Sequence, residues 1–136
     1  MQCAADVMQR DVITIAPETP ILDVYRMFVE EEIHGAPVVD ESGAVRGVVS
    51  TLDLLRFGNE EAYVSRDSAG QPTAEDAATR ELVTVGPEAT VEEVARTMLA
   101  QHVHRVLVVD KQRELLGVIS TFDLLRIVAT GNDKPA

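Results

Sequence analysis

The chain of 136 residues repeats itself at a constant offset of 70 positions, without a gap. The segment His34–Asp40 (HGAPVVD) aligns with His104–Asp110 (HRVLVVD), and Gly47–Arg56 (GVVSTLDLLR) aligns with Gly117–Arg126 (GVISTFDLLR). Two unrelated segments would not align at one constant offset over most of their length by chance. The sequence therefore consists of two copies of one unit, and any fold must be a tandem arrangement of that unit.

Each copy is predicted to form a strand, a helix, two strands and a helix, the order β-α-β-β-α. Short β-branched runs predict strands, and proline or a capping box predicts the start of each first helix. The expected elements are first strands at Val12–Ile15 and Leu82–Val85, helices starting at Thr19–Pro20 and Thr90–Glu93, buried strands at Pro37–Val39 and Val106–Val109, further strands at Val45–Val49 and Leu115–Ile119, and closing helices from Thr51 and Thr121.

The domain organisation follows from the repeat. We expect residues 1–64 to hold the first repeat with the start of a linker, and residues 65–136 to hold the second repeat. Turn formers in Phe57–Thr73 mark the linker, and Asp40–Gly43 predicts a hairpin turn that its counterpart Asp110–Arg113 must make without glycine. A unit of about 55 residues is marginal alone, so the two units should pack their sheets about a pseudo-two-fold axis as one α/β (α+β) domain.

The composition excludes several classes of function. The net charge is −11, with 12 basic against 23 acidic residues and no tryptophan, which disfavours binding of DNA or RNA. No apolar run approaches the roughly 18 residues of a membrane span. The single cysteine, Cys3, rules out an internal disulfide, and Met1–Asp6 lacks the features of a signal peptide. We therefore expect a cytoplasmic protein without a membrane segment.

At this point the residues resemble a known family. The strings HRVLVVD at 104–110 and GVISTFDLL at 117–125, their counterparts in the first half, and the opening Asp6–Met8 resemble the cystathionine β-synthase (CBS) domain. Two such units resemble a CBS pair, or Bateman module. The resemblance implies a regulatory rather than catalytic protein that binds AMP, ADP, ATP, S-adenosylmethionine or a dinucleotide in clefts between its halves. It also implies a homodimer, signalling to a partner protein, and no required cofactor.

The motif Ser-x-x-Asp closes both repeats, as Ser50 with Asp53 and as Ser120 with Asp123. A carboxylate at a helix start can accept hydrogen bonds from both ribose hydroxyls, and a serine hydroxyl with free backbone N–H groups can meet phosphate oxygens. In the family the matching residues do so. The same spacing is also a plain N-terminal capping signal, so both interpretations stay open.

A histidine precedes the buried strand of each repeat, as His34-Gly35 and as His104-Arg105. The family often supplies phosphate contacts from a His-Arg pair at this place, and arginine offers phosphate a bidentate fork. The first repeat lacks the arginine, and losing a charged partner costs about 1.5–3 kcal/mol. We therefore expect unequal sites, with the second repeat binding better. The alternative for Arg105 is a surface ion pair.

The first strands supply the remaining candidates. The family lines its adenine slot with residues that match Thr14 and Thr84, and an apolar wall would come from Val12, Ile13 and Leu82; β-propensity is the alternative explanation for the threonines. A metal site at His102 and His104 is disfavoured, because no cysteine or third histidine lies nearby in the sequence. No catalytic set is apparent, so we expect no enzyme. Two hypotheses remain: an adenylate-binding regulatory module, and a structural dimerisation or protein-interaction module without a physiological small ligand.

Overall fold

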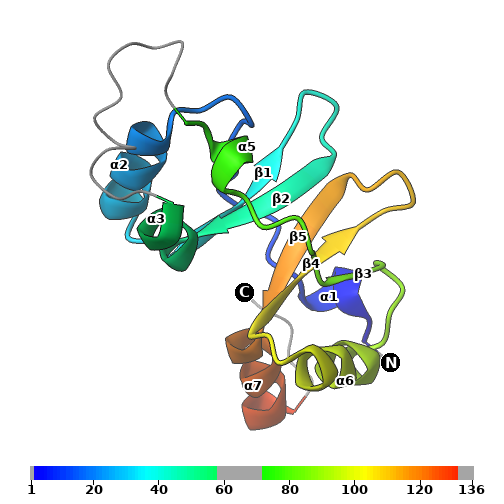
Figure 1. The fold of residues 1–136 in the computed structure, drawn as a ribbon. Coiled ribbons are helices and arrows are strands. Elements are labelled where there is room, and N and C mark those ends of the chain that lie inside the picture. Colours follow the sequence, from blue (N-terminus) through cyan, green and yellow to red (C-terminus); the bar gives the residue numbers. More distant parts are fainter. Residues whose placement is uncertain (1, 58–71, 132–136) are drawn as a thin grey trace. The chain divides into compact units, whose positions relative to one another are not determined.

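A computed structural model describes residues 2–57 and 72–131 of the chain (Figure 1). The chain divides into two compact units, Ile13–Glu81 and Met1–Val12 with Leu82–Ala136. The units do not follow the boundary between the repeats. The opening segment of each repeat belongs to the unit that contains the strands of the other repeat, and each unit is described by itself below.

The unit of residues 13–81 is built on one antiparallel pair of strands. Its elements are α2 (Ile21–Glu31), β1 (Gly35–Val39), β2 (Val45–Ser50), α3 (Thr51–Phe57) and α5 (Ala74–Ala77). Strand β1 runs antiparallel to β2, with Gly35 opposite Ser50 and a shift of register between Val38 and Val39. Ile15 forms a single parallel bridge to Val38.

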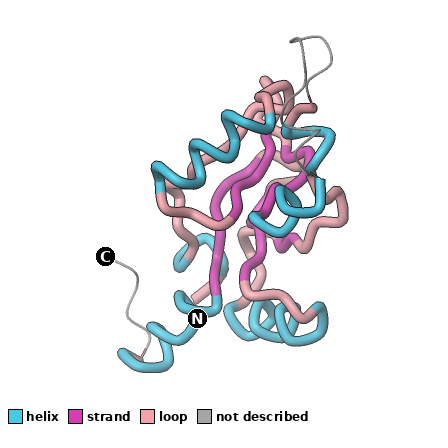
Figure 2. Tube along the Cα trace, turned by 60° about the vertical axis from the view of Figure 1, so that its left-hand side comes forward, coloured by secondary structure: helices cyan, strands magenta, loops and turns pink. Residues whose placement is uncertain are grey.

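The unit of residues 1–12 and 82–136 has the same plan with a third strand. Its elements are α1 (Ala4–Val7), β3 (Thr84–Val85), α6 (Val91–Gln101), β4 (Arg105–Val109), β5 (Leu115–Ser120) and α7 (Thr121–Thr130). Strand β3 lies parallel to β4, and β4 lies antiparallel to β5 with Arg105 opposite Ser120. Figure 2 distinguishes these strands from the helices that pack against them.

The predicted α/β order of strand, helix, two strands and helix is confirmed in both repeats, but the first strands are shorter than predicted. Val12–Ile15 contributes only the bridge at Ile15, and Leu82–Val85 contributes only the two residues of β3. The reason lies in the backbone pairing: Ile15 N donates to Pro37 O and Ile15 O accepts from Val39 N, whereas Ile13 and Thr14 are exposed. Helix α2 begins one residue later than predicted, with Pro20 rather than Thr19 as its N-cap.

The short helices α1 and α5 were not predicted, and they close the core of each unit. Each begins with a capping box, Cys3 with Asp6 and Thr73 with Asp76, and each buries two apolar side chains. The buried residues around them are Ile15, Ile21, Val24, Val38 and Val49 in one unit and Val94, Val106, Val108 and Ile119 in the other. Burial of side chains of this kind contributes about 1.5–3 kcal/mol each.

The hairpin turns follow the prediction. Gly43 adopts a φ of 90° between β1 and β2, and Arg113 adopts a φ of 66° between β4 and β5. In both turns the first aspartate holds the loop, because Asp40 Oδ1 accepts from Ser42 N at 2.9 Å and Asp110 Oδ1 accepts from Gln112 N at 2.9 Å. The second repeat therefore makes the same turn with Arg113 in the left-handed backbone conformation.

The chain that follows α1 or α5 crosses the second long strand of its unit at a glycine. Gln9 exchanges two backbone hydrogen bonds with Val118, and Thr79 exchanges two with Val48. A Cβ on the neighbouring Gly117 would lie 2.8 Å from Gln9 O, and one on Gly47 would lie 2.9 Å from Thr79 O. These crossings bring Gln9 and Thr79 to the ends of β5 and β2. Among the helices of residues 2–57 and 72–131, none has the length and apolar character needed to cross a membrane.

Candidate functional site

The second Ser-x-x-Asp motif joins β5 to α7 as a complete capping box. Ser120 Oγ accepts from Asp123 N at 3.2 Å, and Asp123 Oδ2 accepts from Ser120 N at 2.8 Å and from Ser120 Oγ at 3.1 Å. The serine thus satisfies an N–H group that the first helical turn leaves without a partner. The capping role considered for this motif is present in the structure.

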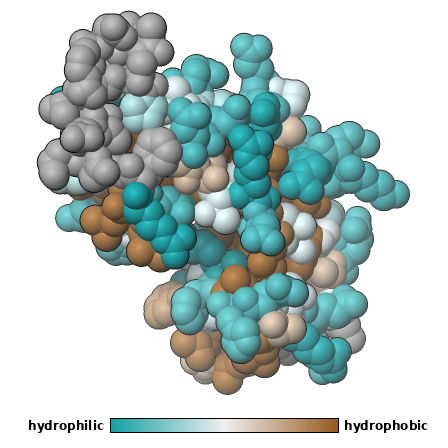
Figure 3. All heavy atoms as spheres, viewed as in Figure 1, coloured by the Kyte–Doolittle hydropathy of each residue, from teal (hydrophilic) through white to brown (hydrophobic). Residues whose placement is uncertain are grey.

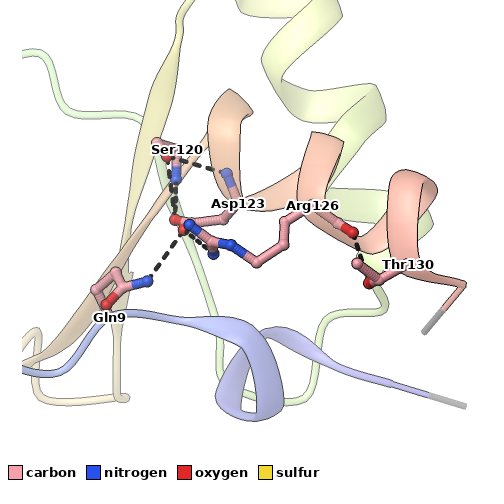
Figure 4. A network of polar contacts seen from close by, with 5 residues as sticks. All are labelled: Gln9, Ser120, Asp123, Arg126 and Thr130. Carbon is pink, nitrogen blue, oxygen red and sulfur yellow. Dashed lines mark hydrogen bonds and ion pairs between the residues drawn. The ribbon is translucent and has the colours of Figure 1, made fainter. Parts of the chain in front are cut away.

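The other carboxylate oxygen of Asp123 is held by two further side chains (Figure 4). Oδ1 accepts from Gln9 Nε2 at 3.0 Å and from Arg126 Nη1 at 3.0 Å. The Arg126 guanidinium also lies 5.2 Å from the centre of the Phe122 ring. Asp123 is the one buried charged residue in the described part of the chain, with 4% of its surface exposed.

The charge of Asp123 is favoured by its neighbours. Burial raises the pKa of this carboxyl, but hydrogen bonds from the Ser120 backbone, Gln9, Arg126 and the Ser120 hydroxyl more than offset burial, so the pKa lies below its ordinary value. Asp123 is therefore a carboxylate at neutral pH. Its four acceptor positions face four donors.

The first Ser-x-x-Asp motif has the same cap but a weaker outer contact. Asp53 Oδ2 accepts from Ser50 N at 2.8 Å and from Ser50 Oγ at 3.0 Å, and Ser50 Oγ accepts from Asp53 N at 3.1 Å. Asp53 Oδ1 accepts from the Thr79 hydroxyl at 3.0 Å. Asp53 is only half-buried, and Arg56, three residues further on, is exposed. The two motifs therefore differ in their neighbours and not in their caps.

The His-Arg pair of the second repeat lies beside Ser120. Arg105 opens β4 directly opposite Ser120, and His104 O accepts from Thr121 N at 2.8 Å. Both side chains are exposed. Within the described residues Arg105 has no carboxylate partner, so the alternative of a surface ion pair is not seen there. In the first repeat His34 takes the same place beside Ser50 and Thr51, and Gly35 leaves it without the cation.

The first-strand candidates differ in exposure. Thr84 lies in β3 opposite Leu107 of β4, two residues along that strand from Arg105. Thr84, Leu82 and Val12 are half-buried, whereas Thr14 and Ile13 are exposed. The structure thus places Thr84, Arg105 and Ser120 on adjacent strands of one sheet.

Three residues that contact these motifs were not predicted from the sequence: Gln9, Arg126 and Thr79. Arg126 follows Asp123 by three residues on a helix, which is the spacing of an intrahelical ion pair and could have been recognised. Gln9 lies 114 residues from Asp123, and no local signal links them. Gln9 and Thr79 occupy equivalent positions of the two repeats, 70 residues apart. This equivalence is the one signal in the sequence that relates the two residues to each other.

A second concave feature lies on the helices of the unit of residues 13–81. A groove of about 890 Å³ is lined mainly by apolar residues of α2 and α3, among them Tyr25, Val29 and Leu55. No cluster of three or more potential metal ligands occurs in the part of the chain that the structure describes.

Comparison with known proteins identifies the class to which this fold and these motifs belong. The CBS domain model matches residues 4–60 and 74–130. The chain belongs to the CBS domain family and carries two copies of that domain.

The chain is also similar to individual proteins in sequence and in fold. The chain is 30% identical over 119 residues to the pig (Sus scrofa) 5'-AMP-activated protein kinase subunit gamma-3, covering 86% of this chain but only 23% of that relative. The fold is similar to that of CBSX2 in complex with AMP, with a TM-score of 0.82, 26% identity, and coverage of 98% of this chain and 100% of that one. The crystal structure of the CBS-pair protein CBSX2 from Arabidopsis thaliana is also similar, with a TM-score of 0.79, 25% identity, and coverage of 95% of each chain. A CBS domain pair solved with 5'-methylthioadenosine and S-adenosyl-L-methionine is similar in fold, with a TM-score of 0.76, 23% identity, and coverage of 96% and 98%.

Proposed function

We propose that this chain is a regulatory module that binds an adenosine-containing ligand such as AMP, ADP, ATP or S-adenosylmethionine, and that it is not an enzyme. The observation that carries the proposal is the placement of an exposed cation, Arg105, directly opposite Ser120 where β4 begins and β5 ends. A guanidinium suits phosphate, and hydroxyl and carboxylate groups suit ribose. The likeness to a protein solved with AMP supports the same ligand class.

The proposal gives each candidate residue a role. Arg105 and the neighbouring histidines would contact phosphate, the Ser-x-x-Asp motifs would contact ribose and phosphate, and the first-strand residues would line the adenine. The residues are Ser120, Asp123, His104, Arg105 and Thr84 with Leu82 from the second repeat, and Ser50, Asp53, His34, Thr14, Val12 and Ile13 from the first repeat. Ligand binding would favour one conformation of the chain and so signal to a partner protein in the cytoplasm.

We also propose that the chain forms a homodimer through its exposed apolar helix faces. In the unit of residues 13–81 these side chains are Leu22, Tyr25, Val29, Leu52 and Leu55, and in the other unit they are Leu99, Phe122, Leu125 and Val128. Figure 3 shows hydrophobic side chains gathered over the helices at the bottom of the view. Monomers rarely expose patches of this kind.

A second copy of the chain is the occupant that fits these faces best. Three pairs of exposed residues, Val29 with Leu99, Leu52 with Phe122 and Leu55 with Leu125, occupy equivalent positions of the two repeats. A pattern that one chain presents twice suits a symmetric, self-complementary interface. These nine helix side chains are 40–80% exposed and would form the apolar centre of such an interface.

A second candidate function is a structural interaction module without a small ligand. The observation in its favour is that both aspartates already cap their helices, so the motif has a use without any ligand. This candidate predicts a folded dimer that no nucleotide stabilises.

A binding panel separates the two functions. AMP, ADP, ATP, S-adenosylmethionine and NAD are tested by thermal shift and calorimetry on the wild type and on the variant D53N/D123N. A ligand at 100 times its Kd adds about 2.7 kcal/mol to stability, which moves the Tm by several degrees. We expect at least one adenylate to do so for the wild type and not for the variant. The control D23N/E92Q removes two exposed helix charges and should bind like the wild type. No shift with any ligand on a folded wild type would refute the proposal.

A further inference from the structure

The exposed helix faces of the two repeats differ in shape and in charge, although the repeats share one fold. We infer that the proposed homodimer is head-to-tail: helix α7 of one copy docks in the apolar groove that α2 and α3 form on the other copy. Each copy supplies one groove and one α7, so a twofold axis makes this contact twice. The inference rests on the proposed homodimer and names the two surfaces that meet in it.

The groove on the unit of residues 13–81 is concave and apolar, with a volume of about 890 Å³. A stripe of α2, whose residues recur at spacings of three and four, lines it together with α3; the side chains are Leu22, Tyr25, Val29, Glu32 and Leu55. A concave surface cannot fill an identical concave surface. Pairing of this face with itself would therefore leave its side chains without the close contacts of a well-packed interface.

The corresponding face of the other unit carries its bulk on a different helix. The position of Tyr25 on α2 is taken by Ala95 on α6. Apart from Leu99, the large exposed apolar side chains described in this unit recur every three residues along α7, as Phe122, Leu125 and Val128. They are 62–80% exposed, and this spacing keeps them on one side of the helix. Helix α7 is therefore a protruding apolar surface of the kind that a groove can accommodate.

The distribution of charge favours the same pairing. Helix α2 ends in the three consecutive exposed carboxylates of Glu30–Glu32, at a helix terminus that is itself negative. Pairing of this face with itself would bring two such acidic ends into one interface, where like charges repel. The single carboxylate of α7, Asp123, is buried and paired with Arg126. Docking of α7 thus adds no unpaired negative charge to the acidic end of the groove.

Opposite charges at Leu55 and Leu125 test the pairing on the full chain by sedimentation. The single variants L55K and L125E should each weaken the dimer at least about tenfold, because each brings an unpaired charge into the interface. In a head-to-tail dimer the double variant L55K/L125E places a cation near an anion in both contacts, so it should dimerise within about tenfold of the wild type. The matched control L55E/L125E has like charges at the same positions and should be weakened at least about a hundredfold.

The alternatives give different results. In a head-to-head dimer, lysine would meet lysine and glutamate would meet glutamate, so equal weakening of L55K/L125E and L55E/L125E would overturn the pairing and leave the dimer in place. If L125E weakens the dimer and L55K does not, the groove has another occupant, for instance residues 58–71 of the same chain, and the inference is wrong. A monomeric wild type would refute the proposed homodimer itself.

Disulfide cross-linking tests the same pairing without any change of charge. The variant C3S/L55C/L125C removes the single native cysteine and adds one thiol to each of the two surfaces. Oxidation should give a covalent dimer in which position 55 of one chain is linked to position 125 of the other, as identified by mass spectrometry of the peptides. Links that join position 55 to position 55, or position 125 to position 125, would overturn the head-to-tail arrangement.

Discussion

The carboxylate of Asp123 keeps its charge in a buried position because every lone pair has a donor. Removing one partner of such a group leaves the other partners unsatisfied, which costs more than the contact itself contributes. The exposed ion pairs Asp23 with Arg26 and Glu92 with Arg96 lie in solvent, where a pair contributes less than about 1 kcal/mol. Among the charged residues of the described chain, Asp123 should therefore matter most for stability.

The variant D123N tests this at the scale of one residue. At pH 7 we expect it to lower the free energy of unfolding by about 2–3 kcal/mol, because asparagine has one acceptor oxygen in place of two, so either the Ser120 donors or Gln9 and Arg126 lose their acceptor. The pKa of Asp123 is lowered in the folded state, so its stabilising contribution is complete above the unfolded pKa of about 3.9 and is lost as the pH falls through the lower folded pKa. Urea unfolding of both proteins from pH 7 to pH 2.5 measures this difference.

The difference between the wild type and D123N should shrink below about pH 4 and stay constant above about pH 5. The control D23N should differ from the wild type by less than about 0.5 kcal/mol at pH 7, because its charge is exposed. A deficit of D123N that is equally large at pH 7 and pH 2.5 would contradict the assigned ionisation.

At the scale of the element, local signals predicted the long helices and the hairpins. The capping box at Thr90 and Glu93 and the glycine at position 43 are written in adjacent residues, so they could be recognised. The first strands were overpredicted because β-propensity does not say whether a neighbour is available, and only Ile15 finds one in its unit. The partners of Asp123 could not be predicted in full, because Gln9 reaches it only through the tertiary fold.

The glycine crossings can be tested by adding a single methyl group. In G117A the new Cβ would lie 2.8 Å from Gln9 O and 2.7 Å from Met8 Sδ, so the segment after α1 must shift. We expect a loss of about 1–3 kcal/mol of stability, as for other overpacked sites. Thermal or urea unfolding measures it, and the amide protection of Gln9 should fall at the same time.

The matched control for this variant is G86A. A Cβ at position 86 has only the flexible end of Glu88 within 4 Å, at 3.6 Å. Its stability should therefore stay within about 0.5 kcal/mol of the wild type. Equal stabilities for G117A and G86A would mean that the crossing at β5 is looser than the structure indicates.

At the scale of the whole molecule, the two repeats share the same strands and helices but differ in the residues around their Ser-x-x-Asp motifs. Position 9 is glutamine and position 79 is threonine, position 35 is glycine and position 105 is arginine, yet the strands around them keep one register. Three exposed helix positions are apolar in both repeats: Val29 and Leu99, Leu52 and Phe122, and Leu55 and Leu125. Exposed apolar side chains at equivalent positions of both repeats, in a chain of net charge −11, support the proposed contact with a second copy.

The last prediction concerns this assembly. Sedimentation of the wild type should give twice the monomer mass of 14.8 kDa, because the proposed dimer would bury the exposed side chains of Leu55 and Leu125. A glutamate at either position would bury an unpaired charge, so L55E and L125E should weaken the dimer at least tenfold. The control Q112E adds the same charge in an exposed hairpin turn and should leave the mass unchanged. A wild-type chain that sediments as a monomer at all accessible concentrations would refute the dimer. Variants that stay dimeric would place its interface on another surface.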